Sequence, residues 1–254
     1  MSDISFSRLL RDRAFDSLFQ WLLLAAAIGV GALLLWDYGF LTYLFSADTS
    51  YISAIIVALF AALSLFCLYL LLDLSPELRA IEAATEHAEK DGRLEVSQDG
   101  EISFGSYRMP AGRAVTAYMR DVAIRQARDP EGKGELLVRA LSAQLRTRVR
   151  IGIFMSDVLY KLGLLGTVVG FIMMLGSVGD LGNFDVETLR GALQSMSSGM
   201  AVSLLTTIAG LVCGTLLRTE FAFADGLVST IVQRTARLTE VYVVPMLART
   251  RTDV

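Results

Sequence analysis

Two long segments without charged side chains dominate the second half of the sequence. The first runs from Leu162 to Gly179, which is 18 residues, and the second runs from Gly191 to Leu217. A helix rises about 1.5 Å per residue, so each segment is long enough to cross a hydrocarbon core of roughly 30 Å. The sequence therefore predicts two consecutive membrane-spanning helices, at residues 153–179 and 199–217.

Small residues recur in both segments at steps of three or four, which places them on one face of a helix. We predict that the glycines of this pattern pack the two helices together, because lipid gives apolar helices no hydrophobic reason to associate and close backbone contact must do so instead. These glycines are Gly163, Gly166, Gly170, Gly199, Gly210 and Gly214. The hydroxyl residues of the same faces are Thr167, Ser203, Thr206 and Thr207. Each hydroxyl either donates a hydrogen bond to a backbone carbonyl of its own helix and has no further role, or belongs to a shared polar surface.

The rest of the chain places these segments in a polytopic membrane protein. Of the 254 residues, 54% are hydrophobic and 19% are charged, which is too apolar for a soluble domain. Two further apolar runs predict membrane spans at 20–36 and 52–72. Trp21 and Trp36 flank the first run, as aromatic residues do at membrane interfaces. A cleaved signal peptide is the alternative for this run, but no small-residue cleavage site follows it. The two cysteines, Cys67 and Cys213, lie inside predicted spans and are expected to be packing residues.

The hydrophilic segments predict a mostly helical cytoplasmic domain. Between the second and third spans lie 13 Lys or Arg and 13 Asp or Glu, a balance that suits a folded domain. Within it we predict a helix that begins at Pro76 and a β-hairpin at residues 93–104 that turns at Asp99-Gly100. A helix from about Gly112 to Arg128 and a continuous helix from Glu135 into the third span are also predicted. The hydrophilic parts are an N-terminal segment (1–19), the cytoplasmic domain (73–150), a periplasmic loop with a short amphipathic helix (180–198) and a C-terminal helix (218–254).

The distribution of cations predicts the orientation. Of 23 Lys and Arg residues, 3 precede the first span, 13 lie between the second and third spans, and 5 follow the fourth. By the positive-inside rule, both termini and the large loop face the cytoplasm.

Asp157 and Lys161 lie one helical turn apart at the inner end of the third span, where they can pair; a role for Asp157 in an ion path is the alternative.

None of the four spans carries an Asp, Glu, His or Arg near its centre. Threonine and serine do not titrate at physiological pH, so this chain alone offers no residue to carry a proton across a bilayer. If the assembly conducts protons, the titrating group is expected to come from a partner. The predicted fold class is an all-α polytopic membrane protein with four spans and both termini inside.

The pairing of LGLLGTVVG with GMAVSLLTTIAGL resembles the signature of the MotA/TolQ/ExbB proton channel family. Four spans with a large inner loop between the second and third are similar to its MotA-like branch, whereas the TolQ/ExbB branch has three spans. Val202 stands where TolQ and ExbB have a membrane glutamate, which also favours the MotA-like branch. Tyr160 departs from the family pattern, because a proline is usual at that place.

The resemblance implies a homopentamer in the bacterial inner membrane whose last two spans surround a dimer of a single-span, MotB/ExbD/TolR-like protein. The partner would carry the titrating aspartate, and ion flow would turn one component relative to the other. Thr167 and Thr207 match the family threonines near the ion path, with Thr206 and Ser203 as further hydroxyls. The transported ion is expected to be H⁺, with Na⁺ as the alternative, and neither a cofactor nor a nucleic-acid partner is expected.

The sequence also bears on three other functional classes: a membrane scaffold, a transporter and an enzyme. A passive membrane scaffold would use the same glycines and threonines for packing alone. A transporter would show internal repeats and broken helices near the middle of the membrane, and the sequence shows neither. An enzyme is not expected, because the sequence contains no recognisable pairing of nucleophile with base or set of metal ligands.

Overall fold

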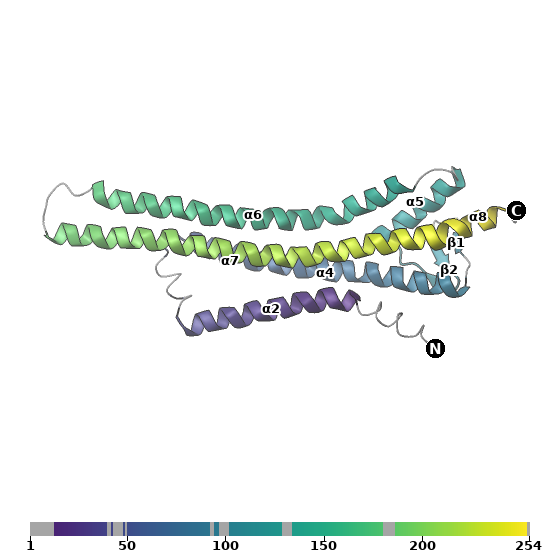
Figure 1. Ribbon diagram of the computed structural model, residues 1–254, viewed down its shortest axis with the longest axis horizontal. Helices are drawn as coiled ribbons and strands as arrows, with labels where there is room; N and C mark the ends of the chain where they lie inside the picture. Colours follow the sequence, from purple (N-terminus) through teal and green to yellow (C-terminus); the bar gives the residue numbers. More distant parts are fainter. Residues whose placement is uncertain are drawn as a thin grey trace. The chain divides into compact units, whose positions relative to one another are not determined.

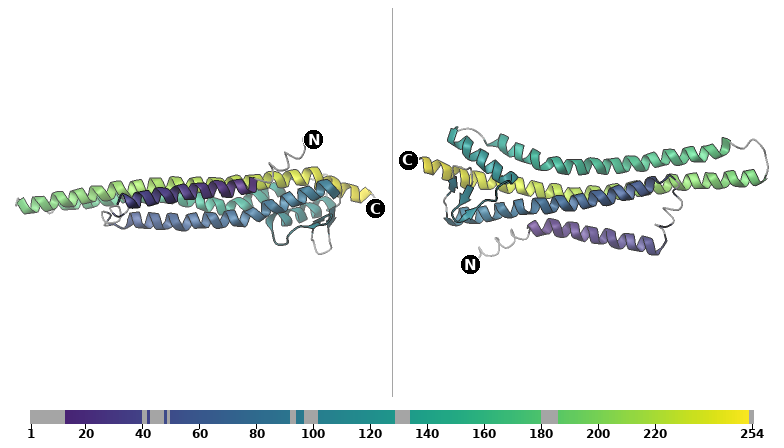
Figure 2. Two further views of the ribbon diagram at one scale, coloured as in Figure 1. Left: turned by 90° about the horizontal axis from the view of Figure 1, so that it is seen from below. Right: turned by 180° about the vertical axis from the view of Figure 1, so that it is seen from behind.

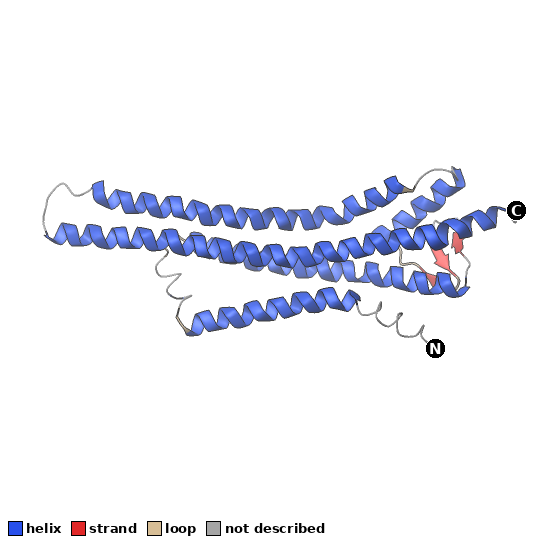
Figure 3. Ribbon diagram, viewed as in Figure 1, coloured by secondary structure: helices blue, strands red, loops and turns tan. Residues whose placement is uncertain are grey.

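The computed structural model describes residues 13–39, 42, 48, 50–91, 94–96, 102–128, 134–179 and 186–252, and within them helices predominate (Figures 1 and 3). Three short strands form the sheet drawn in red in Figure 3. In chain order the elements are α2 (Arg13–Asp37), α4 (Ile52–Asp91), β1 (Leu94–Val96), β2 (Ile102–Phe104), β3 (Tyr107–Arg108), α5 (Ala114–Arg128), α6 (Glu135–Gly179), α7 (Val186–Leu238), the π-helix η1 (Thr239–Val243) and α8 (Val244–Thr252).

The contacts divide the chain into two compact units. The apolar unit comprises residues 21–68 and 150–222, and the polar unit comprises residues 1–20, 69–149 and 223–254. Four helices are long and apolar enough to cross a membrane: Phe19–Asp37, Ile52–Lys90, Glu135–Gly176 and Leu189–Ala248. The predicted class, an all-α protein with four spans, is confirmed. The side of the membrane on which the termini lie remains a prediction.

No new helix begins at Pro76, so that prediction was wrong. The helix continues for 40 residues with Pro76 in its interior. A proline there removes one backbone donor and normally kinks or breaks a helix. The preceding residue, Ser75, is buried, and its hydroxyl donates to the Leu71 carbonyl at 2.6 Å. The Ser75 hydroxyl thus adds a hydrogen-bond donor next to Pro76, which has no backbone N–H.

Helix α7 is likewise longer than the sequence predicted. The short helix within residues 180–198 and the C-terminal helix at 218–254 were predicted as separate elements, but one helix of 53 residues runs from Val186 to Leu238. Several glycines interrupt its sequence, and each costs about 1 kcal/mol relative to alanine in a helix interior. Tertiary packing outweighs such propensities, and the buried residues of α7 extend along both units. The polar loop before α7, residues 180–185, lies outside the described residues.

The predicted hairpin is confirmed and is part of a slightly larger sheet. Strand β1 pairs antiparallel with β2, and β2 pairs antiparallel with β3, which the sequence analysis missed because it has only two residues. Ile102 and Phe104 are buried and anchor the sheet in the polar unit. The predicted turn at Asp99-Gly100 lies outside the described residues. Helix α5 and the start of α6 at Glu135 agree with the prediction.

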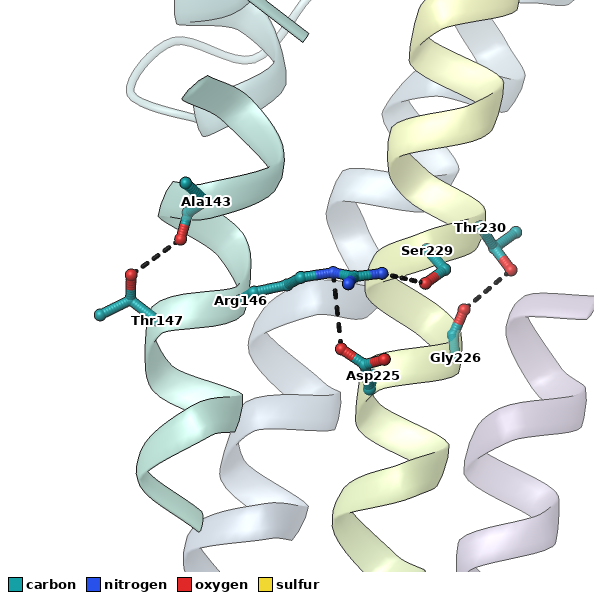
Figure 4. Close-up of polar contacts among 7 residues, drawn as sticks. All are labelled: Ala143, Arg146, Thr147, Asp225, Gly226, Ser229 and Thr230. Carbon is teal, nitrogen blue, oxygen red and sulfur yellow. Dashed lines mark hydrogen bonds and ion pairs between the residues drawn. The ribbon is translucent and has the colours of Figure 1, made fainter. Parts of the chain in front are cut away.

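Polar side chains connect the long helices within the polar unit. Arg146 of α6 reaches α7, where its Nη2 donates to the Ser229 hydroxyl at 2.7 Å and its Nε lies 3.5 Å from Asp225 Oδ1 (Figure 4). Arg234 of α7 pairs with Glu82 of α4, which runs beside α7 there (Figure 2). The two arginines thus fix α7 to both neighbouring helices.

Glu77 connects α4 to the beginning of α5. Its Oε1 accepts the Ala114 N–H at 3.0 Å and its Oε2 accepts the Val115 N–H at 3.4 Å. The first N–H groups of a helix have no partner inside the helix, so a carboxylate from elsewhere both satisfies them and complements the helix dipole. Because Glu77 is only 6% exposed, water cannot readily replace it.

Replacing Glu77 by alanine should therefore destabilise the protein by about 1–3 kcal/mol, since the Ala114 and Val115 N–H groups would lose their acceptor. Glu89→Ala is the matched control, because Glu89 is an exposed residue of the same helix. The measurement is denaturant unfolding of the purified protein in detergent. Equal stabilities for the two variants would show that Glu77 does not hold α5.

Candidate functional site

The two segments that the sequence singled out lie side by side in the apolar unit, as α6 and α7 (Figure 1). Their contact, which we call the α6–α7 seam, is formed by Gly163, Gly166, Gly170, Gly199, Gly210 and Gly214 with the residues that pack on them. Gly163 and Gly210 face each other across it. A Cβ on Gly210 would lie 2.7 Å from Gly163 Cα and 2.9 Å from the Leu159 carbonyl oxygen. Backbone meets backbone at this point, so no side chain fits between them.

One turn further along α6, Gly166 lies against Thr206. A Cβ on Gly166 would overlap the Thr206 side chain, which is fully buried. The Thr206 hydroxyl donates to the Val202 carbonyl of its own helix at 2.8 Å. The structure therefore places Thr206 in the packing of the seam, with its hydrogen bond made internally.

The seam continues to Gly170 and Gly199. A Cβ on Gly170 would lie 2.6 Å from Ser203 N, and one on Gly199 would lie 2.7 Å from both Gly170 O and Met174 N. Ser203 adds a hydrogen bond between the helices, because its hydroxyl donates to the Thr167 carbonyl at 2.8 Å. The structure thus brings Ser203 and the Thr167 backbone together.

Near the other end of the seam, Tyr160 packs flat against Gly214. A Cβ on Gly214 would lie 3.0 Å from Tyr160 Cζ, and the Tyr160 hydroxyl is 3.0 Å from Thr215 Oγ1. Tyr160 occupies the place at which the resemblance would expect a proline. Here α6 continues without interruption, and an aromatic ring fixes its position against α7.

The side chains of Thr167 and Thr207 are half-buried, unlike that of Thr206. The Thr167 hydroxyl donates to Leu164 O at 2.6 Å, and the Thr207 hydroxyl donates to Ser203 O at 2.8 Å. A hydroxyl that has donated its hydrogen still has lone pairs to offer. Thr167 and Thr207 can therefore accept a hydrogen bond or coordinate a cation without breaking the bonds they already make.

Outside the seam, α6 and α7 carry large apolar side chains that are exposed in the isolated chain. A membrane protein must cover such side chains with lipid, with further copies of itself or with a partner. On α6 they include Leu164, Leu165, Val168, Phe171 and Ile172, and on α7 they include Met200, Leu204, Ile208 and Leu211.

The structure gives Asp157 a different partner from the one predicted. Its Oδ1 lies 3.0 Å from Arg218 Nη1 on α7, whereas Lys161 is exposed and forms no ion pair within the described residues. The guanidinium of Arg218 approaches from the neighbouring helix and satisfies the carboxylate directly. Both side chains of the Asp157–Arg218 pair are about half exposed, so the pair contributes at most about 1 kcal/mol.

Sequence reasoning missed Glu220, which is fully buried in α7 just beyond the predicted end of the fourth span. Its Oε1 accepts a hydrogen bond from the Ser64 hydroxyl of α4 at 3.0 Å. A signal was present, because Leu217, Glu220 and Ala224 follow one another at helical spacing on a stripe that is otherwise apolar. The predicted span ends before the charged Arg218, whereas the stripe continues beyond it.

Within the part of the chain that the structure describes, no group of three or more His, Cys, Asp or Glu residues could hold a metal ion. Cys67 and Cys213 are both buried and unpaired.

Comparison with known proteins gives one family match. The model of the MotA/TolQ/ExbB proton channel family matches residues 108–236. The matched region contains α5, α6 and nearly all of α7, and thus the whole seam. No curated protein matches the sequence.

The seam predicts which glycines tolerate a larger residue. Gly166→Ala should destabilise the protein by about 1–3 kcal/mol, because its methyl group would overlap the buried Thr206 side chain. Gly176→Ala is the control on the same helix, since a Cβ there has nothing within 4 Å. The thermal unfolding midpoint of each purified variant in detergent measures the difference. Equal midpoints for the two variants would show that α6 and α7 do not approach as closely as described.

Proposed function

The chain belongs to the MotA/TolQ/ExbB proton channel family, and we propose that it is the stator-type channel subunit of an inner-membrane rotary motor. As a family member it is a multi-pass membrane protein of the ion-conducting, motor-associated type rather than a member of an enzyme class. We further propose that five copies surround a dimer of a single-span partner protein. Proton flow through this assembly would be converted into rotation of one component against the other.

One observation carries the proposal: the seam presents hydroxyl groups but no charged group. From Leu162 to Gly179 and from Gly191 to Leu217 the chain has no Asp, Glu, Lys, Arg or His. Protons cross a membrane by way of groups that titrate, and threonine does not. A channel built on α6 and α7 therefore needs an acid from another polypeptide, and an aspartate on the partner's span supplies it.

In this mechanism Thr167 and Thr207 act on the partner's carboxyl group. That carboxyl group takes up a proton from the outer side and becomes neutral, which allows it to move along an apolar path. The neutral acid donates its O–H to a threonine oxygen, whose own hydrogen is already directed to a backbone carbonyl. The proton leaves on the inner side, and the charged carboxylate returns to a polar position. The same oxygens could replace part of the hydration shell of Na⁺, so H⁺ is proposed and Na⁺ is the alternative.

A passive scaffold is the second candidate, and the hydrogen bonds of the same threonines favour it. The hydroxyls of Thr167 and Thr207 are both satisfied within their own helices, an arrangement that also occurs at positions with no function. In a scaffold these residues would contribute only to packing. Removing the hydroxyls should then leave both assembly and activity intact.

Thr207→Ala distinguishes the two functions. In the motor, loss of a hydrogen bond worth about 1.4 kcal/mol to the moving carboxyl group should slow proton flux about tenfold, while the assembly remains intact. Thr167→Ala should act in the same direction. The measurement is proton flux into liposomes that contain the chain together with a single-span partner protein that carries a membrane aspartate.

Thr219→Ala is the matched control. Thr219 is on the same helix and donates to the carbonyl four residues earlier, as Thr207 does, but it is exposed and lies beyond the seam. Unchanged flux in Thr207→Ala, or an equal loss in Thr219→Ala, would contradict the proposed role of the hydroxyl. Failure of the chain to form a complex with any single-span protein would favour the scaffold.

A further inference from the structure

Trp21 is the most deeply buried described side chain of helix α2. This side chain is 8% exposed, and it is the only buried one among the α2 residues whose exposure is described, Phe19 to Asp37. The tryptophan at the other end of the run, Trp36, is 64% exposed. Whatever surrounds Trp21 therefore decides how firmly the first span is held.

Glu220 of α7 lies beside Trp21, in surroundings that are otherwise apolar. It is fully buried, as are the adjacent Phe221 and Leu217 on its own helix. Phe221 also contacts Phe66 of α4, with ring centroids 6.4 Å apart. Such surroundings exclude water from the carboxyl group.

The polar atoms around Glu220 are incompletely paired. Ser64 of α4 donates to Oε1, but Glu220 Oε2 has no hydrogen-bond partner within the described structure, and neither has Trp21 Nε1. The Trp21 indole N–H is nevertheless close enough to act on the carboxyl group. Buried polar atoms are nearly always satisfied, so the contact between Trp21 and Glu220 is a weakly satisfied point in this packing.

The groups around Glu220 bear on the protonation state of its carboxyl group. On α4 the neighbour of Glu220 is Cys67, a buried free thiol, and among the described side chains of α2 the neighbour is the uncharged indole of Trp21. On α6, Gly152 packs against the neighbouring Phe221 ring. Arg218, two residues before Glu220, pairs with Asp157 instead, and no described Lys or Arg forms an ion pair with Glu220. An ionised carboxylate buried without a cation is strongly disfavoured, whereas a neutral acid with hydrogen bonds is tolerated.

We propose that Glu220 is a proton-binding site of this chain and that its bound proton holds the first span in place. In the neutral acid the carbonyl oxygen Oε1 accepts from Ser64, and the bound proton is on Oε2, which faces the Trp21 indole. When the proton leaves to the aqueous phase, the carboxylate must recruit water, and Trp21 is the neighbour whose displacement would admit it, since Trp21 is itself 8% exposed. The first span then loosens from α4 and α7. This site lies outside the α6–α7 seam and goes beyond the channel function proposed above.

Infrared spectroscopy of the purified full-length protein in lipid tests the protonation directly. At neutral pH the wild type should show the C=O stretch of a protonated carboxylic acid, and Glu220→Gln should lose this band. Glu89→Gln is the matched control and should retain it, because Glu89 is exposed to solvent. A wild type without the band, or a Glu220→Gln variant that keeps it, would overturn the proposal.

Hydrogen exchange tests the coupling to the first span. Raising the pH until the acid band disappears should accelerate exchange in residues 21–37 severalfold in the wild type, relative to Glu220→Gln at the same pH. The amide cannot ionise, so the variant provides the reference for the ordinary effect of pH on exchange. Equal exchange in both proteins over the whole pH range would overturn the role of the proton in holding α2. If the variant does not fold, the wild type alone decides, because loss of its band and loosening of α2 must occur at the same pH.

Discussion

The close approach of two backbones, α6 and α7, is the constraint on which the rest of the apolar unit depends. At Gly163 and Gly210 even a single methyl group would meet the opposing main chain. In lipid no hydrophobic driving force brings such helices together, so dispersion contacts and short hydrogen bonds between them must hold them in contact. Because the glycines take up the facing surfaces, the large apolar side chains of both helices point elsewhere, where lipid, further subunits or a partner can cover them.

The same constraint determines where polar groups can lie. Hydroxyl groups fit into the seam because they bond back to their own helix or, as Ser203 does, to the carbonyl of the neighbouring helix. Charged groups are kept away from it. Asp157 and Arg218 neutralise each other beyond one end of the seam, and Glu220 contacts α4 rather than α6. The result is a seam between α6 and α7 that holds hydroxyl groups and no acid, together with a separate buried acid, Glu220, on another face of α7.

The sequence predicted those parts of the structure in which a strong local pattern and the tertiary packing agree. The small-residue stripe marked the glycines that lie in the seam, and uninterrupted helical periodicity gave the beginning of α6 at Glu135. Prediction from the sequence failed where tertiary packing overrides a local sequence signal. Pro76 normally starts or breaks a helix, yet α4 runs through it, and α7 continues past the charged Arg218. Glu220 and the partner of Asp157 depend on which helices become neighbours, and spacing along one helix does not contain that information.

The central claim is that α6 and α7 form a hydroxyl-lined path that conducts only when another polypeptide places an acid in it. Proton flux measured in liposomes tests this most directly, first with the purified chain alone and then with the single-span partner. The claim predicts no flux above that of empty liposomes for the chain alone and clear flux once the partner is present. Sustained proton flux through the chain alone would contradict it.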